Sequence, residues 1–189
     1  MLNKVRLFGI VLSSSFLFSS TVFAGWTLDG NNSSLFYVTS KAAALSELNS
    51  FANLVGVIRD DGRARVNIGL GSVDTAIDIR DERMRDIVFQ VENNQRSNIN
   101  MQTNIALLNT LDAGESIRAT YDAVIELIGE EQTLPVNVVI TGLENGGLLV
   151  TLATPLIVNV ALFGLADEIE QLREIAGLPS INNNIVVDF

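Results

Sequence analysis

The segment that decides the fold runs from Ile117 to Ile140 and reads IRATYDAVIELIGEEQTLPVNVVI. Its odd positions from Ile117 to Leu127 are apolar or aromatic, whereas the even positions are mostly polar. Alternation with a period of two is typical of β-strands that bury one face. The stretch from Gly129 to Gln132 is a polar turn signal, and apolar residues then recur at every second position up to Ile140. The segment therefore predicts two adjacent antiparallel strands.

The same pattern continues along the rest of the chain. Asn145-Gly146 predicts a hairpin turn, because both residues tolerate positive φ. One apolar face then extends from Leu148 to Leu162, and Pro155 indicates a bend in it. Alternating or apolar segments predict further strands at Leu35 to Lys41, Leu48 to Ile58, Val66 to Leu70 after a turn at Asp60-Asp61-Gly62, Ile99 to Leu107, and Asn183 to Phe189. About eight strands result, the number that closes into a small barrel.

Two segments have helical rather than strand character. Asp78 to Val88 is short and highly charged. Asp167 to Ala176 carries its apolar residues on one helical face, and Gly177 with Pro179 ends it. The predicted fold class is all-β with minor helix, namely one antiparallel barrel of about eight strands with one helix near the C-terminus.

The N-terminal 24 residues have the order of a secretory signal. Lys4 and Arg6 precede an apolar run from Leu7 to Phe18, and Val22-Phe23-Ala24 supplies the compact residues that a signal peptidase reads. We therefore expect residues 1–24 to be a cleaved signal peptide and residues 25–189 to be one exported domain. An uncleaved anchor is the alternative, but the apolar run is too short to span a bilayer.

Charge and composition exclude several classes of function. Without residues 1–24 the chain has 10 basic and 22 acidic residues, a net charge of −12. Such a surface repels phosphate backbones, so no nucleic-acid partner is expected. Because the chain has neither cysteine nor histidine, disulfides, thiolate nucleophiles, Ser-His-Asp triads and metal sites built on those residues are excluded. We expect no metal ligands and no catalytic residues.

The remaining candidates for catalysis are carboxylates and one lysine. The acidic residues from Asp78 to Asp86 alternate with Arg80, Arg83 and Arg85, at spacings that predict mutual neutralisation on a helical turn. A Ser–Lys pair would have to use Lys41 near Ser40 or Ser46, and nothing distinguishes that neighbourhood from an ordinary strand end. The sequence therefore predicts a protein that is not an enzyme.

The stretch from Trp26 to Phe89 carries a family resemblance. It contains Trp26-Thr27-Leu28-Asp29, then Gly71-Ser72-Val73-Asp74-Thr75, then Arg80-Asp81-Glu82-Arg83-Met84-Arg85-Asp86. This order resembles the YceI-like family, secreted bacterial proteins whose lipocalin-like β-barrel holds a long isoprenoid lipid. Thr133-Leu134-Pro135-Val136 is similar to a later Thr-x-Pro-Val element of the family.

The resemblance implies a periplasmic carrier that holds an isoprenoid or isoprenoid quinone inside the barrel, with no other cofactor and no stable membrane insertion. The sequence leaves open whether the protein forms a homodimer. The positions that the resemblance assigns to the lining are Val66, Ile68, Ile117, Tyr121, Val136, Val138, Val150 and Leu152. Phe51, Met84 and Phe89 would close one end, and Arg80 with Asp81 would fix the charged turn rather than touch the ligand.

Three alternatives remain from the sequence alone. An eight-stranded outer-membrane barrel would explain the alternation at Ile185, Val187 and Phe189, although one Trp and two Tyr are few for its aromatic girdles. A ligand-free extracytoplasmic interaction module would have a filled core and no internal tunnel. An enzyme would need carboxylates that converge in an unrecognised cleft.

Overall fold

Two antiparallel sheets form the framework of the computed structural model, which describes residues 25–42 and 45–189. Sheet A has the order β1-β4-β5-β7-β8-β9-β10, with bounds Trp26–Thr27, Leu54–Ile58, Arg63–Gly69, Arg96–Gln102, Ser116–Leu127, Glu130–Gly142 and Leu148–Leu152. Sheet B has the order β11-β12-β2-β3-β6, with bounds Leu156–Asn159, Asn184–Asp188, Leu35–Lys41, Leu45–Phe51 and Val73–Asp74.

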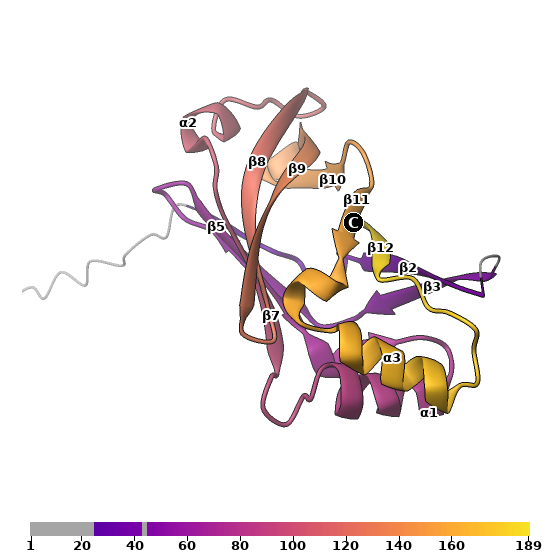
Figure 1. Ribbon diagram of the computed structural model, residues 1–189. Helices are drawn as coiled ribbons and strands as arrows, with labels where there is room; N and C mark the ends of the chain where they lie inside the picture. The colour runs from indigo at the N-terminus through magenta and orange to yellow at the C-terminus, as the bar shows by residue number, and fades with distance from the viewer. Residues whose placement is uncertain (1–24, 43–44) are drawn as a thin grey trace, which may run out of the picture.

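Three bent strands join the sheets into one nearly closed barrel (Figure 1). β3 continues into β4 across Ala52 and Asn53, and β5 continues into β6 through a 3₁₀ turn, η1 (Leu70–Ser72). β10 continues into β11 after a break at residues 153–155, which confirms the bend predicted at Pro155. With each bent strand counted once, and β1 left aside as a two-residue edge, the described residues form eight antiparallel barrel strands. The predicted fold class is confirmed.

Short helices cover the two ends of the barrel (Figure 1). One end carries α1 (Asp78–Arg83), the π-helical turn η2 (Met84–Val88), the 3₁₀ turn η4 (Val160–Phe163) and α3 (Ala166–Ile175). α2 (Ile105–Leu108) lies at the other end, and η3 (Glu144–Gly146) forms part of the β9–β10 turn. α1, η2 and α3 agree with the two predicted helical segments. No helix in the described residues is long and apolar enough to cross a membrane.

The longest pairing between two strands is that of β8 with β9, which runs from Ser116 opposite Thr141 to Leu127 opposite Glu130. Its turn consists of Ile128 and Gly129, with φ values of 52° and 81°. Two central residues with positive φ match the twist of the flanking strands. The predicted turn from Gly129 to Gln132 was therefore placed too late, because residues 130–132 already belong to β9. The Asn145-Gly146 turn is confirmed, with φ values of 72° and 75°.

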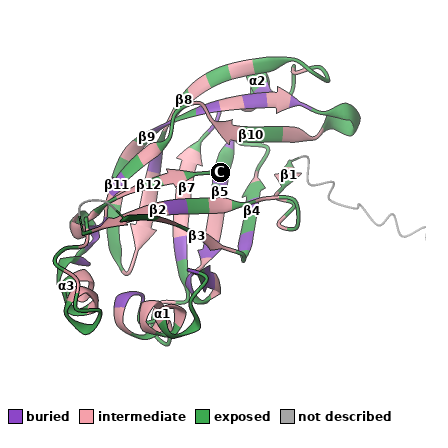
Figure 2. Ribbon diagram, turned by 90° about the vertical axis from the view of Figure 1, so that its right-hand side faces the viewer, coloured by how far each residue is buried: buried purple, intermediate pink, exposed green. Residues whose placement is uncertain are grey.

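Two other predicted strands were too long. The segment expected to be a strand up to Leu107 leaves the sheet at Gln102, because Asn104 caps α2 by accepting a hydrogen bond from the Leu107 amide. The apolar face expected to reach Leu162 ends at Asn159, and Leu162 is exposed on η4. At these two strand ends, a side-chain cap and a helical turn thus take the place of the extended backbone that the alternation predicted. Burial nevertheless alternates along most strands, so one face of each sheet points inward (Figure 2).

Candidate functional site

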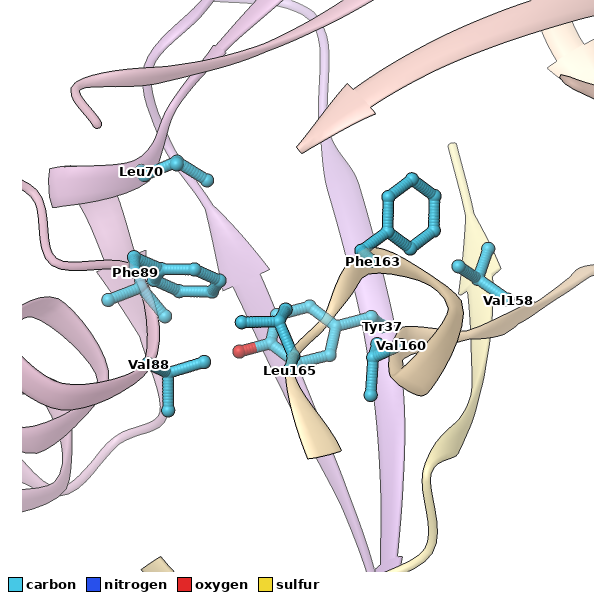
Figure 3. Packing of buried hydrophobic residues seen from close by; sticks show 9 residues of the cluster. Tyr37, Leu70, Val88, Phe89, Val158, Val160, Phe163 and Leu165 are labelled. Carbon is cyan, nitrogen blue, oxygen red and sulfur yellow. The ribbon is translucent and has the colours of Figure 1, made fainter. Parts of the chain in front are cut away.

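The helical end of the barrel is closed by a compact apolar group, which we call the end cluster. Its buried members are Tyr37, Leu70, Val73, Val88, Phe89, Val158, Val160, Phe163 and Leu165. Figure 3 shows Val88 and Phe89 approaching from one side and Phe163 and Val158 from the other. The ring of Phe51 lies 5.5 Å from that of Tyr37 and 5.7 Å from that of Phe89, measured between centroids. Four aromatic rings therefore fill this end.

The interior of sheet A holds a second group, which we call the lumen cluster. Leu108, Ala123, Val136, Val138 and Ile140 are its buried members. Half-buried apolar residues pack around them, namely Trp26, Ile58, Ile99, Met101, Leu111, Ile117, Ala119, Tyr121, Leu148, Leu152 and Leu156. Many of these side chains face inward from barrel strands and yet keep part of their surface accessible. The lumen cluster is therefore packed less completely than a solid core.

The two clusters form one apolar surface rather than two separate cores. Leu156 packs against both of them, at the point where β10 passes into β11. Ala123 of the lumen cluster lies opposite Leu134, which packs against the end cluster. Apolar side chains of the inner wall thus continue from the lumen cluster into the end cluster, with single buried polar residues such as Ser97 among them.

The residues predicted to line the interior fall into three groups. Phe51, Met84 and Phe89 lie together in or against the end cluster, at the end they were expected to close. The residues placed in or against the lumen cluster are Ile117, Tyr121, Val136, Val138 and Leu152. The third group consists of Val66, Ile68 and Val150.

The third group lies on the same inner face but outside both clusters. Val66 and Ile68 of β5 lie opposite Ile99 and Ser97 of β7. Val150 lies opposite the buried Ile140, but 36% of its surface is exposed because β10 is the last strand of sheet A. The contact of all eleven residues with a ligand stays a prediction.

The alternation argument missed two aromatic residues that shape this interior. Tyr37 is buried in the end cluster, and its position in the predicted strand Leu35 to Lys41 is the signal that could have identified it. Trp26 packs against the lumen cluster, and its indole Nε1 donates a 2.8 Å hydrogen bond to the carbonyl oxygen of Gly146. This bond joins the first strand to the β9–β10 turn across 120 residues of sequence. No local pattern identifies a partner so distant.

Two tyrosine hydroxyls in the interior have no hydrogen-bond partner. The oxygen atoms of Tyr37 and Tyr121 are both inaccessible to solvent and unpaired. Burial raises the pKa of both phenols. The charge of Arg80 opposes part of that effect at Tyr37, and the nearby backbone amide of Asn104 opposes part of it at Tyr121. Both side chains therefore stay neutral at ordinary pH and present a hydroxyl group to an otherwise apolar interior.

The charged turn is held by bonds different from those predicted. Arg80 donates a hydrogen bond to Glu47 on β3 and another, 2.5 Å long, to the Thr75 carbonyl oxygen. Asp81 accepts a 2.8 Å hydrogen bond from the Thr75 amide. No ion pair joins the carboxylates and arginines of residues 78–86, all of which the structure describes, so the predicted mutual neutralisation is wrong. Arg80 and Asp81 fix this turn, as expected.

The described residues do not form the Ser–Lys pair that the sequence left open. Lys41 Nζ lies 2.5 Å from Glu47 Oε2, whereas the hydroxyl groups of Ser40 and Ser46 bond to each other on the opposite face of the hairpin. A Ser–Lys pair is therefore not formed. Within residues 25–42 and 45–189, no group of three or more acidic side chains is placed to hold a metal ion.

A hollow of about 720 Å³ lies on the outer face of β4, β5 and β7. Its lining is Asn53, Val55, Asn67, Gly69, Gly71, Ser72, Val91, Gln95 and Arg96. Asn67 and Val55 alternate with the inward-facing residues of their strands, so this hollow lies outside the barrel wall. Three amide side chains and the guanidinium group of Arg96 stand there beside Val55 and Val91, so the hollow is more polar than the inner wall.

The comparison with protein families agrees with this arrangement. The sequence matches the YceI-like domain over residues 26–189, which is nearly all of the described chain. The chain belongs to the YceI-like family. A comparison with curated proteins gave no match.

Two solved structures show how far the likeness to known folds extends. A polyisoprenoid-binding domain from Saccharophagus degradans, implicated in plant cell wall breakdown, is 30% identical, with a TM-score of 0.85. The alignment covers 88% of this chain and 95% of that domain. BcnA from Burkholderia cenocepacia is 13% identical, with a TM-score of 0.63 and coverage of 85% of this chain and 96% of its own. At that identity BcnA supports the fold alone.

Proposed function

We propose that this YceI-like protein carries a long lipophilic molecule, an isoprenoid or an isoprenoid quinone, inside its barrel in the bacterial periplasm. The observation that carries this proposal is the largely apolar inner wall, along which the end cluster and the lumen cluster meet at Leu156. The polyisoprenoid-binding domain of Saccharophagus degradans, which shares the fold and 30% of the aligned residues, supports the same ligand class.

Burial supplies the binding free energy in this proposal. Each Å² of apolar surface removed from water stabilises the complex by about 25 cal/mol. An isoprenoid chain several units long has only apolar surface to offer, and Val136, Val138 and Ile140 form a matching wall. The unpaired hydroxyls of Tyr37 and Tyr121 are the polar groups inside the barrel that could meet an oxygen atom of a head group.

Mass spectrometry of organic extracts tests the proposal directly. The protein is purified without detergent as wild type and as two variants on the same strand. Tyr121→Asp puts a charge without a partner against the lipid and should remove most of it. Thr120→Asp is the matched control, because Thr120 points outward and is exposed, and it should retain wild-type occupancy.

A wild-type protein that carries no lipid, and takes up none when polyprenol or ubiquinone is added back, would refute the carrier function. A ligand-free interaction module would then replace it. Equal loss of lipid from both variants would show that the effect comes from added charge rather than from the inner wall.

A further inference from the structure

The barrel wall lacks a strand between β1 and β10. In sheet B, β12 lies between β11 and β2, and its pairing reaches Val187 opposite Leu156 and Asp188 opposite Phe36. Towards the α2 end, β10 and β1 take the places of β11 and β2, and neither has a second partner among the described residues. Because one strand is missing, the two edges are about two strand spacings apart, or about 10 Å. We call this opening the side window.

The side window leads into the lumen cluster. The inward-facing residues of β10 are Leu148, Val150 and Leu152, and the first and last of them pack against this cluster. Val150 lies between them, and its exposure of 36% means that solvent reaches the inner face of β10 along this edge. A molecule that passes between β1 and β10 therefore arrives directly at the apolar inner wall.

Trp26 spans the side window. Its side chain packs against the lumen cluster from β1, and its indole Nε1 donates the hydrogen bond to the carbonyl oxygen of Gly146, in the turn that leads into β10. Nearer the middle of the barrel, the window ends at Phe189, whose carbonyl oxygen accepts a 3.4 Å hydrogen bond from the Leu152 amide. At the α2 end, one exposed side-chain hydrogen bond thus links the two edges.

Other routes into the barrel are closed more firmly. At the helical end, β6 and β11 are the edges of sheet B, but Val73 of β6 and Val158 of β11 are both buried in the end cluster. At the opposite end, Leu108 of α2 is 2% exposed and belongs to the lumen cluster. Passage between paired strands would break a series of backbone hydrogen bonds, which are costly to leave unmade. At the side window, the loss of one exposed hydrogen bond and the rotation of one ring suffice.

We propose that the side window is the passage through which the lipid enters and leaves the barrel, and that Trp26 is its gate. This inference rests on the proposed carrier function. The gate opens when the indole gives up its bond to Gly146 and turns away from the lumen, while all strand pairs are retained. Water replaces the lost bond, because the bond lies at the surface of the protein. An opening one strand wide admits a single extended isoprenoid chain.

Transfer of ubiquinone between the protein and phosphatidylcholine vesicles measures this passage. Protein loaded with ubiquinone is mixed with vesicles and separated from them at timed intervals, and the quinone in each fraction is quantified after extraction. Uptake by empty protein from loaded vesicles is followed in the same way. Trp26→Phe keeps an aromatic ring but removes the Nε1 donor, so it should speed both uptake and release by about fivefold. The ratio of the two rates should stay within about twofold of wild type, because a gate changes a barrier and not an affinity.

A hydrogen bond of the same kind at the helical end provides the matched control. Gln132 donates from Nε2 to the carbonyl oxygen of Leu162, also at an exposed position and between segments distant in sequence. Gln132→Met removes this donor with little change of shape. It should leave the rates of uptake and release as they are in wild type.

A covalent lock tests the window itself. Because the chain contains no cysteine, a thiol-specific linker about 10 Å long, the expected width of the window, reacts at introduced cysteines alone. Thr27→Cys and Leu149→Cys place one thiol on each edge, at exposed positions. The linker should slow uptake and release by about tenfold or more, and cutting it should restore them. The same linker between Val57→Cys and Arg65→Cys, which lie opposite each other on β4 and β5, should change neither rate.

Three results would overturn the inference. They are unchanged rates in the locked protein, equal acceleration by Gln132→Met, and faster release without faster uptake in Trp26→Phe, which would make Trp26 a ligand contact rather than a gate. A wild type that exchanges ubiquinone while giving any of these results keeps its carrier function and loses only the side window. A wild type that takes up neither ubiquinone nor polyprenol refutes the carrier function, and the inference fails with it.

Discussion

Glu47 on β3 and Arg80 on α1 form an ion pair that ties the β2–β3 hairpin to the helical end of the barrel. Lys41 lies 2.5 Å from the same carboxylate oxygen, so one acid serves two cations. Burial raises the pKa of Glu47, but the hydrogen bond from Lys41 and the charge of Arg80 outweigh burial and hold the pKa below its ordinary value. The carboxylate therefore stabilises the folded protein in its charged form.

This arrangement predicts a stability that falls in acid. Because the pKa of Glu47 in the folded protein is below its ordinary value of 4.5, the charged carboxylate stabilises the fold at pH values above 4.5. This stabilisation is lost as the pH falls through the lowered pKa of the folded state. Glu47→Gln should therefore melt at a lower temperature than wild type at pH 7, and the two curves should converge below pH ~4. Thermal denaturation across this range measures the difference, with the exposed Glu144→Gln as control. A gap that is independent of pH would contradict the prediction.

Truncation in the end cluster should be costly. Leu70 is 1% exposed and lies among aromatic and aliphatic side chains. Leu70→Ala should lower the free energy of unfolding by about 2–5 kcal/mol, because it leaves a cavity in a packed region. Leu149→Ala, on an exposed position of β10, should change it by less than about 0.5 kcal/mol. Urea denaturation at low protein concentration compares the two, and similar losses would contradict the closed packing described for this end.

Blocking the interior should shorten the lipid that fits there. Ala123 has no exposed surface, and it lies where the lumen cluster approaches the end cluster. Ala123→Phe should destabilise the fold by about 1–3 kcal/mol through overpacking. Under the proposed function it should also reduce the amount or the chain length of extracted lipid. Thr120→Phe, on the outward face of the same strand, should do neither. Unchanged lipid in Ala123→Phe would place the ligand elsewhere.

Two glycines with the same backbone conformation should respond differently to alanine. Gly62 and Gly129 have φ values of 80° and 81°. A Cβ atom at Gly62 would lie 2.5 Å from the carbonyl oxygen of Thr103, whereas nothing lies within 4 Å at Gly129. Gly129→Ala should lower the free energy of unfolding by about 1 kcal/mol, because of the strain of positive φ alone. Gly62→Ala should lower it clearly more, because its Cβ atom would also clash. Equal losses of unfolding free energy, measured by chemical denaturation, would show that the turn at residues 60–63 shifts easily to relieve the contact with Thr103.

Export makes a prediction for residues 1–24, which lie outside the described residues. If they are a signal peptide cleaved after Ala24, protein recovered from the periplasmic fraction should begin at Gly25. Intact-mass measurement distinguishes this from the full-length chain. Ala24→Arg should block processing and leave a longer product in the membrane fraction, whereas recovery of Met1 in periplasmic wild-type protein would contradict the proposal.

Alternation predicted the barrel well because the inward-facing positions of its strands are mostly apolar. The odd positions from Ile117 to Leu127 do face inward, and β8 begins within one residue of its expected start. Sequence reasoning failed where a local polar group competes with the sheet, as Asn104 does when it caps α2. It also misassigned the partners of Arg80, since Glu47 lies 33 residues away. Alternation finds the face of a strand but not the distant residue opposite a charge.

The pairing of β2 with β12 has a consequence for how the chain folds. Val38 lies opposite Val186, so β2, near the start of the domain, can pair only after β12, near its end, has become available. Contacts this distant in sequence close large loops and slow folding. Sheet B cannot be completed while the last residues are still being synthesised or translocated. An incomplete barrel would leave the inner wall open to water. If the chain is exported as proposed, this late closure would favour an unfolded chain during passage through a membrane channel.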